Sequence, residues 1–148
     1  MKLKSCLKSF IFLIPLILVF SKSMAEPTFV QSKSLDAGFY LGLTFNNDGT
    51  KMYTVRAERD GTTDSVIEHI LTSAYDISTA TVNNTKVVHR FGGDLGFVPT
   101  QAVFNNDGTK MFIVNHDGIR TIDYYSLSTA FDVSTATFDD AYSINGQE

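Results

Sequence analysis

The sequence predicts an all-β protein built from two repeats of four antiparallel strands each. First, the eight residues 45–52 return unchanged as residues 104–111. Second, a further shared element follows each copy, at residues 74–81 and again at 130–137. Third, Val, Ile, Thr, Tyr and Phe are frequent after the N-terminal segment, and no amphipathic helix of about ten residues is found there.

The N-terminus has the pattern of a secretory signal peptide. Three lysines and no acidic residue precede the apolar run 10–20, and small residues follow at Ser23 and Ala25. An apolar run of 11 residues is shorter than the roughly 20 that a membrane-spanning helix needs. We therefore predict a signal peptide at 1–25 and a mature chain at 26–148 that is periplasmic or extracellular. An uncleaved N-terminal anchor is the alternative.

Charge and cysteine content limit the anchors, disulfides and partners that the mature chain can have. Cys6, the only cysteine, precedes the apolar run, which disfavours a lipid anchor and leaves the mature chain without disulfides. Removing the four lysines of the signal from the 12 basic residues leaves eight, against 16 acidic ones. A net charge near −8 argues against a nucleic-acid or anionic-membrane partner, and no membrane span is expected after signal removal.

The first two strands of each repeat are joined by the tetrapeptide Asn-Asn-Asp-Gly. Asn and Asp favour a tight turn through side-chain hydrogen bonds to the backbone, and Gly accepts the positive φ that closes the turn. The repeated motif is therefore predicted to be a β-hairpin corner. Its structural turn residues are Asn47, Asp48 and Gly49 in the first repeat and Asn106, Asp107 and Gly108 in the second.

Two further strands complete the four that are predicted in each repeat. The second strand of the second repeat, Met-Phe-Ile-Val, is apolar on both sides, which predicts a sheet that is covered on both faces. The polar stretch Ser-Thr-Ala-Thr is interpreted as a connection before the fourth strand. The repeats are placed at about 39–91 and 98–148, with strands at 40–45, 51–55, 65–71 and 86–91 and at 99–104, 110–114, 121–127 and 140–144.

The two repeats differ most in one loop. Asp48 and Asp107 are 59 residues apart, whereas Asp76 and Asp132 are 56 apart, so the first repeat holds three more residues. The insertion falls in polar, Gly-containing sequence, which marks a surface loop. The candidate recognition loops are Arg56, Glu58, Arg59 and Asp60 in the first repeat and Asn115, His116 and Asp117 in the second; an ordinary solvated loop is the alternative.

The hairpin motif at 104–114, Phe-Asn-Asn-Asp-Gly-Thr-Lys-Met-Phe-Ile-Val, resembles the DGTKMYV-type blades of secreted bacterial and phage β-propeller repeat proteins. These blades are distantly similar to YVTN and lactonase-like propellers. Residues 125–137 resemble the second half of the same repeat, so that the likeness covers nearly all of 29–148. The resemblance implies β-propeller-type repeats, with two four-stranded antiparallel blades. Blades of this kind serve many unrelated functions.

The number of repeats departs from a complete propeller. Known propellers use roughly four to eight blades, so two blades cannot close a ring. We therefore expect an incomplete propeller, the N-terminal part of a larger one. The alternatives are self-association of several chains to close a ring and an open sandwich of two blades.

Residues that could carry chemistry are sparse. The sequence has no Gly-x-Ser-x-Gly elbow, phosphate-binding Gly loop or mature cysteine nucleophile. Its histidines, His69, His89 and His116, lack zinc-ligand spacing. The Asn-Asn-Asp-Gly turns lack the spaced acids of a calcium loop, so no cofactor is predicted and calcium is the minor alternative. Tyr124 and Tyr125 are interpreted as packing residues rather than a ligand platform.

These features favour an exported, non-catalytic binding or structural module whose partner is an unknown protein or glycan. The alternative, an enzyme, is part of a lactonase-like propeller hydrolase whose metal site needs additional blades. A third alternative is a non-functional fragment.

Overall fold

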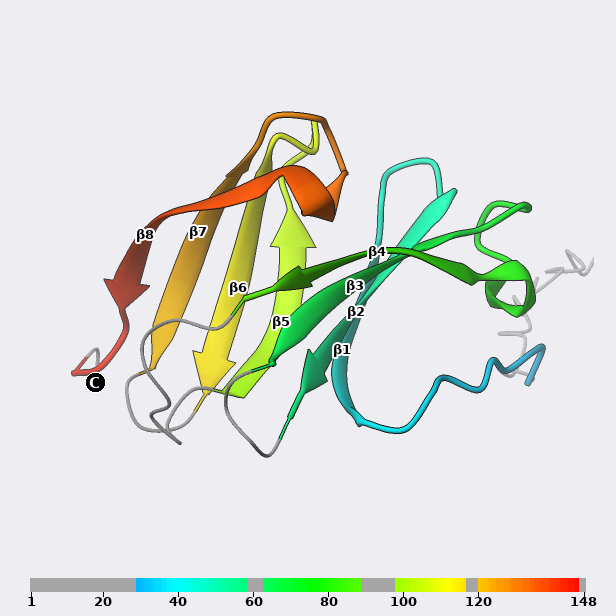
Figure 1. Ribbon diagram of the computed structural model, residues 1–148, viewed down its shortest axis with the longest axis horizontal. Coiled ribbons are helices and arrows are strands. Elements are labelled where there is room, and N and C mark those ends of the chain that lie inside the picture. Colours follow the sequence, from blue (N-terminus) through cyan, green and yellow to red (C-terminus); the bar gives the residue numbers. More distant parts are fainter. Residues whose placement is uncertain (1–28, 59–62, 89–97, 117–119, 147–148) are drawn as a thin grey trace, which may run out of the picture.

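The computed structural model describes residues 29–58, 63–88, 98–116 and 120–146 (Figure 1). Within these ranges eight strands form two four-stranded antiparallel sheets, which confirms the all-β prediction, and neither sheet closes into a barrel or ring. The predicted signal at 1–25 lies outside the described residues. Sheet 1 contains β1 (Phe39–Phe45), β2 (Lys51–Ala57), β3 (Ser65–Ile70) and β4 (Thr81–Val87); sheet 2 contains β5 (Val98–Phe104), β6 (Lys110–His116), β7 (Thr121–Leu127) and β8 (Ala136–Ser143), each sheet in that order.

The fourth strand of each sheet begins earlier than the sequence predicted. β4 begins at Thr81 rather than at residue 86, and β8 begins at Ala136 rather than at residue 140. A short 3₁₀ helix precedes each strand: η1 (Ile77–Thr79) ends one residue before β4, and η2 (Val133–Thr135) leads directly into β8. Both strands lie at a sheet edge, where polar residues are tolerated, so the hydrophobic alternation that marks an inner strand is weak there.

The hairpin turns of the two sheets have the same geometry. In the first turn, Asp48 Oδ1 accepts hydrogen bonds from the Thr50 backbone N–H at 3.0 Å and from the Thr50 hydroxyl at 2.6 Å. The Thr50 hydroxyl bond is the main cause that lowers the pKa of Asp48. Gly49 has a φ of 71°, a conformation that costs glycine nothing. Asp107, Thr109 and Gly108 repeat this arrangement in the second turn.

A second pair of turns carries the 3₁₀ helices. We call residues 75–79 corner 1 and residues 131–135 corner 2. Each begins with an aromatic residue at positive φ, Tyr75 at 60° or Phe131 at 59°, followed by an Asp that caps the 3₁₀ helix. The aromatic N–H donates to the carbonyl of the hairpin glycine, 2.9 Å away in both copies. Hairpin and corner are thus joined in the same way in each sheet.

The sheets pack face to face, with β5 against β1 and β2 (Figure 1). Their shared core takes Tyr53, Val55 and Val66 from sheet 1 and residues such as Met111 and Ile113 from sheet 2. Since side chains alternate along a strand, the neighbours Phe112 and Val114 lie on the opposite face of sheet 2. One core therefore belongs to both sheets.

Residues 29–38 run beside sheet 1 on the side away from sheet 2 (Figure 1). The Gln31 side chain accepts from the Ser78 N–H at 3.1 Å, and the Lys33 ammonium donates to the Ser78 carbonyl at 3.4 Å. Further along, Asp36 forms an ion pair with Arg56 at 3.8 Å. This side of sheet 1 therefore has a partial cover supplied by the chain itself.

Candidate functional site

The joint between the sheets contains a buried carboxylate. Glu68, on β3, has no solvent exposure. Its Oε1 lies 2.9 Å from the Lys51 ammonium and accepts from the Asn83 amide at 2.7 Å, while its Oε2 accepts from the Val133 N–H of corner 2 at 3.0 Å. Because both oxygens are paired, the burial of this charge is compensated.

Corner 2 is held by further polar contacts from sheet 1. The Phe131 carbonyl accepts from the Lys51 ammonium at 2.9 Å and from the Tyr53 hydroxyl at 2.8 Å. Burial, with a smaller contribution from Glu68, raises the pKa of Tyr53, so its hydroxyl keeps the proton that it donates. Asn84 donates its amide to the Asp132 carboxylate at 3.0 Å. We call Lys51, Tyr53, Val55, Val66, Glu68 and Asn84 the joint face of sheet 1.

Sheet 2 carries the equivalent positions on the side turned away from sheet 1. Strand pairing places Phe112 opposite Tyr124, and Tyr124 opposite Asp140, as it places Tyr53 opposite Glu68 and Glu68 opposite Asn84. Lys110 stands where Lys51 stands in the first repeat. We call this set the outward face of sheet 2: Lys110, Phe112, Val114, Ile122, Tyr124, Asp140 and Tyr142.

The outward face is more aromatic than its counterpart. The rings of Phe112 and Tyr124 are stacked at 5.4 Å, and the Lys110 ammonium lies 4.7 Å from the centre of the Tyr124 ring. Tyr124 raises the pKa of Lys110, so the ammonium stays charged. Tyr142 is 62 % exposed, and a hollow of about 380 Å³ lies among Phe112, Ile122, Tyr124 and the end of β8. A partly exposed aromatic surface beside a cation and an acid can bind a partner by apolar and polar contacts together.

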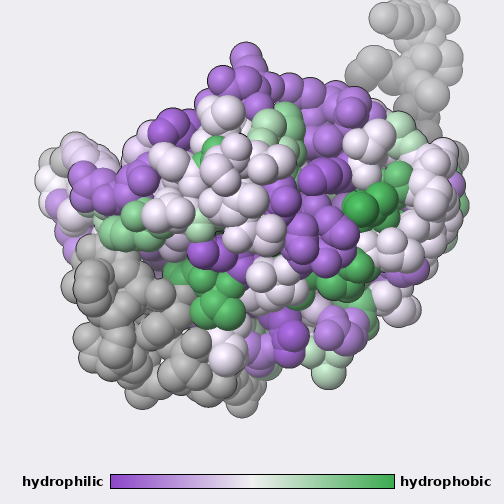
Figure 2. Space-filling view, turned by 45° about the horizontal axis from the view of Figure 1, so that its top comes forward, coloured by the Kyte–Doolittle hydropathy of each residue, from purple (hydrophilic) through white to green (hydrophobic). Residues whose placement is uncertain are grey.

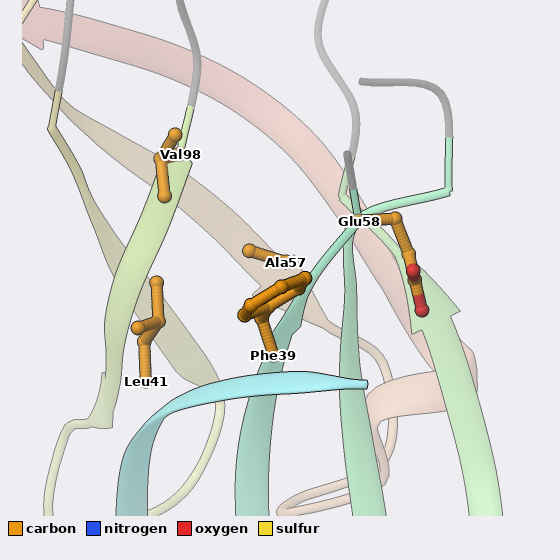
Figure 3. Close-up of a pocket in the computed structure, with 5 residues that line it drawn as sticks. All are labelled: Phe39, Leu41, Ala57, Glu58 and Val98. Carbon is orange, nitrogen blue, oxygen red and sulfur yellow. The ribbon is translucent and has the colours of Figure 1, made fainter. Parts of the chain in front are cut away.

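A smaller, apolar pocket lies at one end of the contact between the sheets. Phe39, Leu41, Ala57, Glu58 and Val98 line it. Figure 3 shows the four apolar side chains around an opening between β1, the end of β2 and the start of β5, and the Glu58 carboxylate pointing away from them. Glu58 and Val98 are the last described residues beside the ranges 59–62 and 89–97. We therefore place no function on this pocket.

The hairpin turn residues lie together in space. The Asn47 amide donates to the Asn106 carbonyl, so the first turn contacts the second. The carboxylates of Asp48 and Asp107 are engaged by the threonine two residues ahead of each, which is a structural use of both acids. Gly49 and Gly108 are both at positive φ.

The structure describes four of the seven candidate recognition residues: Arg56, Glu58, Asn115 and His116. Arg56 lies on β2 and forms ion pairs with Glu58 and Asp36, while Arg59, Asp60 and Asp117 lie outside the described residues. Asn115 is buried in β6, and its amide donates to the Thr121 hydroxyl at 3.1 Å. His116 ends β6 and is exposed.

The tyrosine pair divides between the two faces of sheet 2. Tyr125 is buried in the shared core and donates its hydroxyl to the Val88 carbonyl of the other sheet at 3.3 Å. Tyr124 points to the outward face. The sequence prediction assigned both tyrosines to packing, and it did not identify the outward face on which Tyr124 lies. Alignment of the two repeats could have identified it, because Glu68 and Tyr124 occupy equivalent positions but differ in chemistry.

Two kinds of feature are absent from the described ranges. They contain no helix with the length and hydrophobicity required to cross a membrane. In residues 29–58, 63–88, 98–116 and 120–146 no three His, Cys, Asp or Glu side chains are grouped to share a metal ion. Figure 2 shows hydrophobic patches of limited size among hydrophilic residues on one face of the molecule.

Comparison of the chain with protein-family models, with curated proteins and with solved structures returned no match.

Proposed function

We propose that this chain is an exported, non-catalytic binding or structural module that acts through the outward face of sheet 2. In this proposal each sheet is a propeller-type blade, and the signal at 1–25 directs the chain to the periplasm or the cell exterior. The sequential order of four antiparallel strands in each sheet and the face-to-face packing of the sheets support the blade assignment.

One observation carries the proposal: the positions that sheet 1 uses to hold sheet 2 recur on sheet 2 without a described element packed on them. Tyr53, Val55 and Val66 are almost fully buried, whereas Phe112, Val114 and Ile122 are only half-buried. Half-buried aromatic and branched side chains gain free energy when a partner removes them from water. The outward face is therefore suited to binding.

The polar groups of the joint support a non-catalytic role. Glu68, Tyr53 and Asn84 each have partners within the protein, and these partners belong to the element that they hold in place. Groups committed in this way contribute to packing and orientation rather than to the binding of a substrate.

The test follows the aromatic side chains of the outward face in solution. We expect the NMR signals of Phe112, Tyr124 and Tyr142 to shift on titration with a panel of soluble glycans or on raising the protein concentration, while the signals of Tyr53 and Tyr125 stay unchanged. Unchanged signals for all five residues in both titrations would contradict the proposal. Metal analysis of purified residues 26–148 addresses the hydrolase alternative, because tightly bound stoichiometric calcium or zinc would favour an enzyme.

A further inference from the structure

Corner 1 duplicates the element that already joins the two sheets. Tyr75 and Phe131 share a positive φ, the same backbone bond to the hairpin glycine and the same Asp cap on the following 3₁₀ helix. Corner 2 is used, since Val133 is fully buried and Phe131 is partly buried against the core. Corner 1 is open by comparison, because Tyr75 is 54 % exposed.

The outward face of sheet 2 duplicates the surface that receives a corner. Lys110 stands where Lys51 stands, and its ammonium donates to the Ser126 hydroxyl at 2.7 Å and has further N–H groups for a carbonyl. Val114 and Ile122 stand where Val55 and Val66 make apolar contacts with the other sheet. Among the described residues, one molecule thus carries a corner whose aromatic ring is half exposed and a receiving face that is only half-buried, on different sheets. The contact between sheets 1 and 2 shows how such a pair fits together.

We propose that the outward face of sheet 2 binds corner 1 of a second copy of this chain. The inference rests on the proposed function, because it uses the same outward face of sheet 2. It adds that the partner is a second copy of the chain. Tyr75 of the second copy lies over Phe112 and Tyr124, and its carbonyl accepts from Lys110. Aromatic side chains bury a large apolar area on binding, so Tyr75 supplies the main apolar contact.

Three replacements make this contact weaker than the joint within the chain. Phe112 lacks the hydroxyl that Tyr53 donates, and Tyr124 lacks the carboxylate with which Glu68 accepts the Val133 N–H. Asp140 occupies the position of Asn84, whose amide donates to the Asp132 carboxylate within the chain. In the proposed contact Asp140 therefore faces the Asp76 carboxylate of the second copy. Two carboxylates at this position repel each other. The association is therefore weak and is strengthened by the Asp140→Asn replacement.

The N-terminal segment of the second copy borders this contact. Gln31 and Lys33 bind Ser78 on the far end of corner 1, and Tyr75 remains exposed beside them. A contact centred on Tyr75 leaves these bonds in place. A contact over the whole side of sheet 1 would displace residues 31–36, which limits the area that can be buried and keeps the affinity low.

The symmetry of the contact predicts the assembly. Corner 1 and the outward face are different surfaces, so the association is head-to-tail, and each added copy presents both surfaces again. Such contacts produce rings or chains rather than a symmetric dimer. We expect species larger than a dimer as the concentration rises.

The test is sedimentation velocity of purified residues 26–148 over a concentration series, with five variants, one of them Tyr142→Ser on the outward face. We expect Asp140→Asn to strengthen association and Tyr75→Ala to weaken it by about tenfold, as for a central interface residue. Tyr75→Phe, which matches Phe131, should retain the association. Leu41→Ala is the matched control, because Leu41 is 50 % exposed and lies away from both surfaces. Circular dichroism checks that each variant is folded.

Several outcomes overturn the inference. A chain that stays monomeric in both the wild type and Asp140→Asn contradicts it, as does a closed symmetric dimer. If Tyr142→Ser weakens association and Tyr75→Ala does not, the outward face binds but corner 1 is not its partner, and the proposed function stands alone. If the outward face binds a glycan and the protein does not self-associate, the partner is a glycan and not a second copy of the chain. If Tyr75→Ala does not fold, the association of the Asp140→Asn variant still decides whether the inference holds.

Discussion

At the scale of single residues, the joint depends on one buried charge. Glu68 accepts from a backbone N–H of the other sheet and pairs with Lys51, whose side chain is one-quarter exposed. Removing one partner of a buried pair leaves the other uncompensated, and this costs more free energy than the pair contributes. Glu68 therefore contributes strongly to holding corner 2, together with Lys51, Tyr53 and Asn84.

We predict that Glu68→Ala lowers the free energy of unfolding by about 3 kcal/mol, the lower end for a buried pair because Lys51 retains some water. Glu68→Gln should cost less, since its amide oxygen can still accept from Val133. Urea unfolding measures both. The control is Asp139→Asn, which removes the 3.9 Å ion pair of the more exposed Lys110 and should change little. Equal effects at Glu68 and Asp139 would contradict the assignment.

His69 is a second buried titratable residue, on the other side of sheet 1. Its Nε2 lies 3.0 Å from the Thr54 hydroxyl oxygen, and the side chain is almost fully buried. Burial lowers the pKa of His69 from its ordinary 6.5, partly opposed by the nearby Asp36. The folded state therefore binds this proton less readily than the unfolded state does.

The free energy of unfolding should consequently decrease as the pH is lowered, because His69 becomes protonated. The contribution of His69 is complete above the unfolded pKa of about 6.5 and is lost as the pH falls toward the lower folded value. We expect the free energy of unfolding to decrease between about pH 7.5 and pH 5.5 in the wild type, and to decrease less in His69→Gln. The other histidines are common to both proteins, so a parallel decrease would show that His69 is not the cause.

At the scale of elements, hairpin and corner form one unit in each sheet. The Tyr75 ring lies over Gly49, and the Phe131 ring lies over Gly108, so a Cβ at either glycine would stand 2.4 Å or 2.2 Å from a ring carbon. The two units differ in their surroundings. Phe131 packs against Phe104 in the shared core, whereas Tyr75 is about half exposed.

We predict that Gly108→Ala destabilises the protein more than Gly49→Ala does. Both variants carry the strain of a non-glycine residue at positive φ, about 1–2 kcal/mol. At Gly49 the exposed Tyr75 ring can rotate away from the new methyl group, but at Gly108 the packed Phe131 ring cannot. Denaturant unfolding of the two variants gives the comparison. Equal losses would indicate that the rings do not contribute and that φ alone sets the cost.

At the scale of the whole molecule, the two sheets depend on each other. The larger core cluster contains residues of both sheets, including Tyr53 and Val66 from one and Met111 and Leu127 from the other. Separation of the sheets would expose this cluster on both sides. Folding of either sheet alone should therefore be unfavourable.

We predict one cooperative unfolding transition for residues 26–148. The chain has no tryptophan, so the fluorescence comes from its six tyrosines, of which Tyr53 and Tyr125 lie at the joint. Far-ultraviolet circular dichroism reports on the strands. The two signals should change together with denaturant. Separate transitions would mean that the sheets unfold independently and that the joint contributes little stability.

The repeated sequence determined the local structure of this protein. Identical residues at 45–52 and 104–111 form matching hairpins, because Asp, Thr and Gly make their contacts within a few residues of each other. The edge strands β4 and β8 were misplaced, because their polar residues carry little periodic signal at a solvent-facing edge.

Only the tertiary structure decided which side of each sheet is buried. Equivalent positions have the same strand register, yet Glu68 is enclosed by corner 2, and Tyr124 lies on the outward face. The sequence contains both residues, but burial depends on which element packs against each sheet. That contact joins residues far apart in the chain, such as Glu68 and Val133, which are 65 positions apart. Local patterns carry no signal over such separations, so the joint and the proposed binding surface required the folded arrangement of the two sheets.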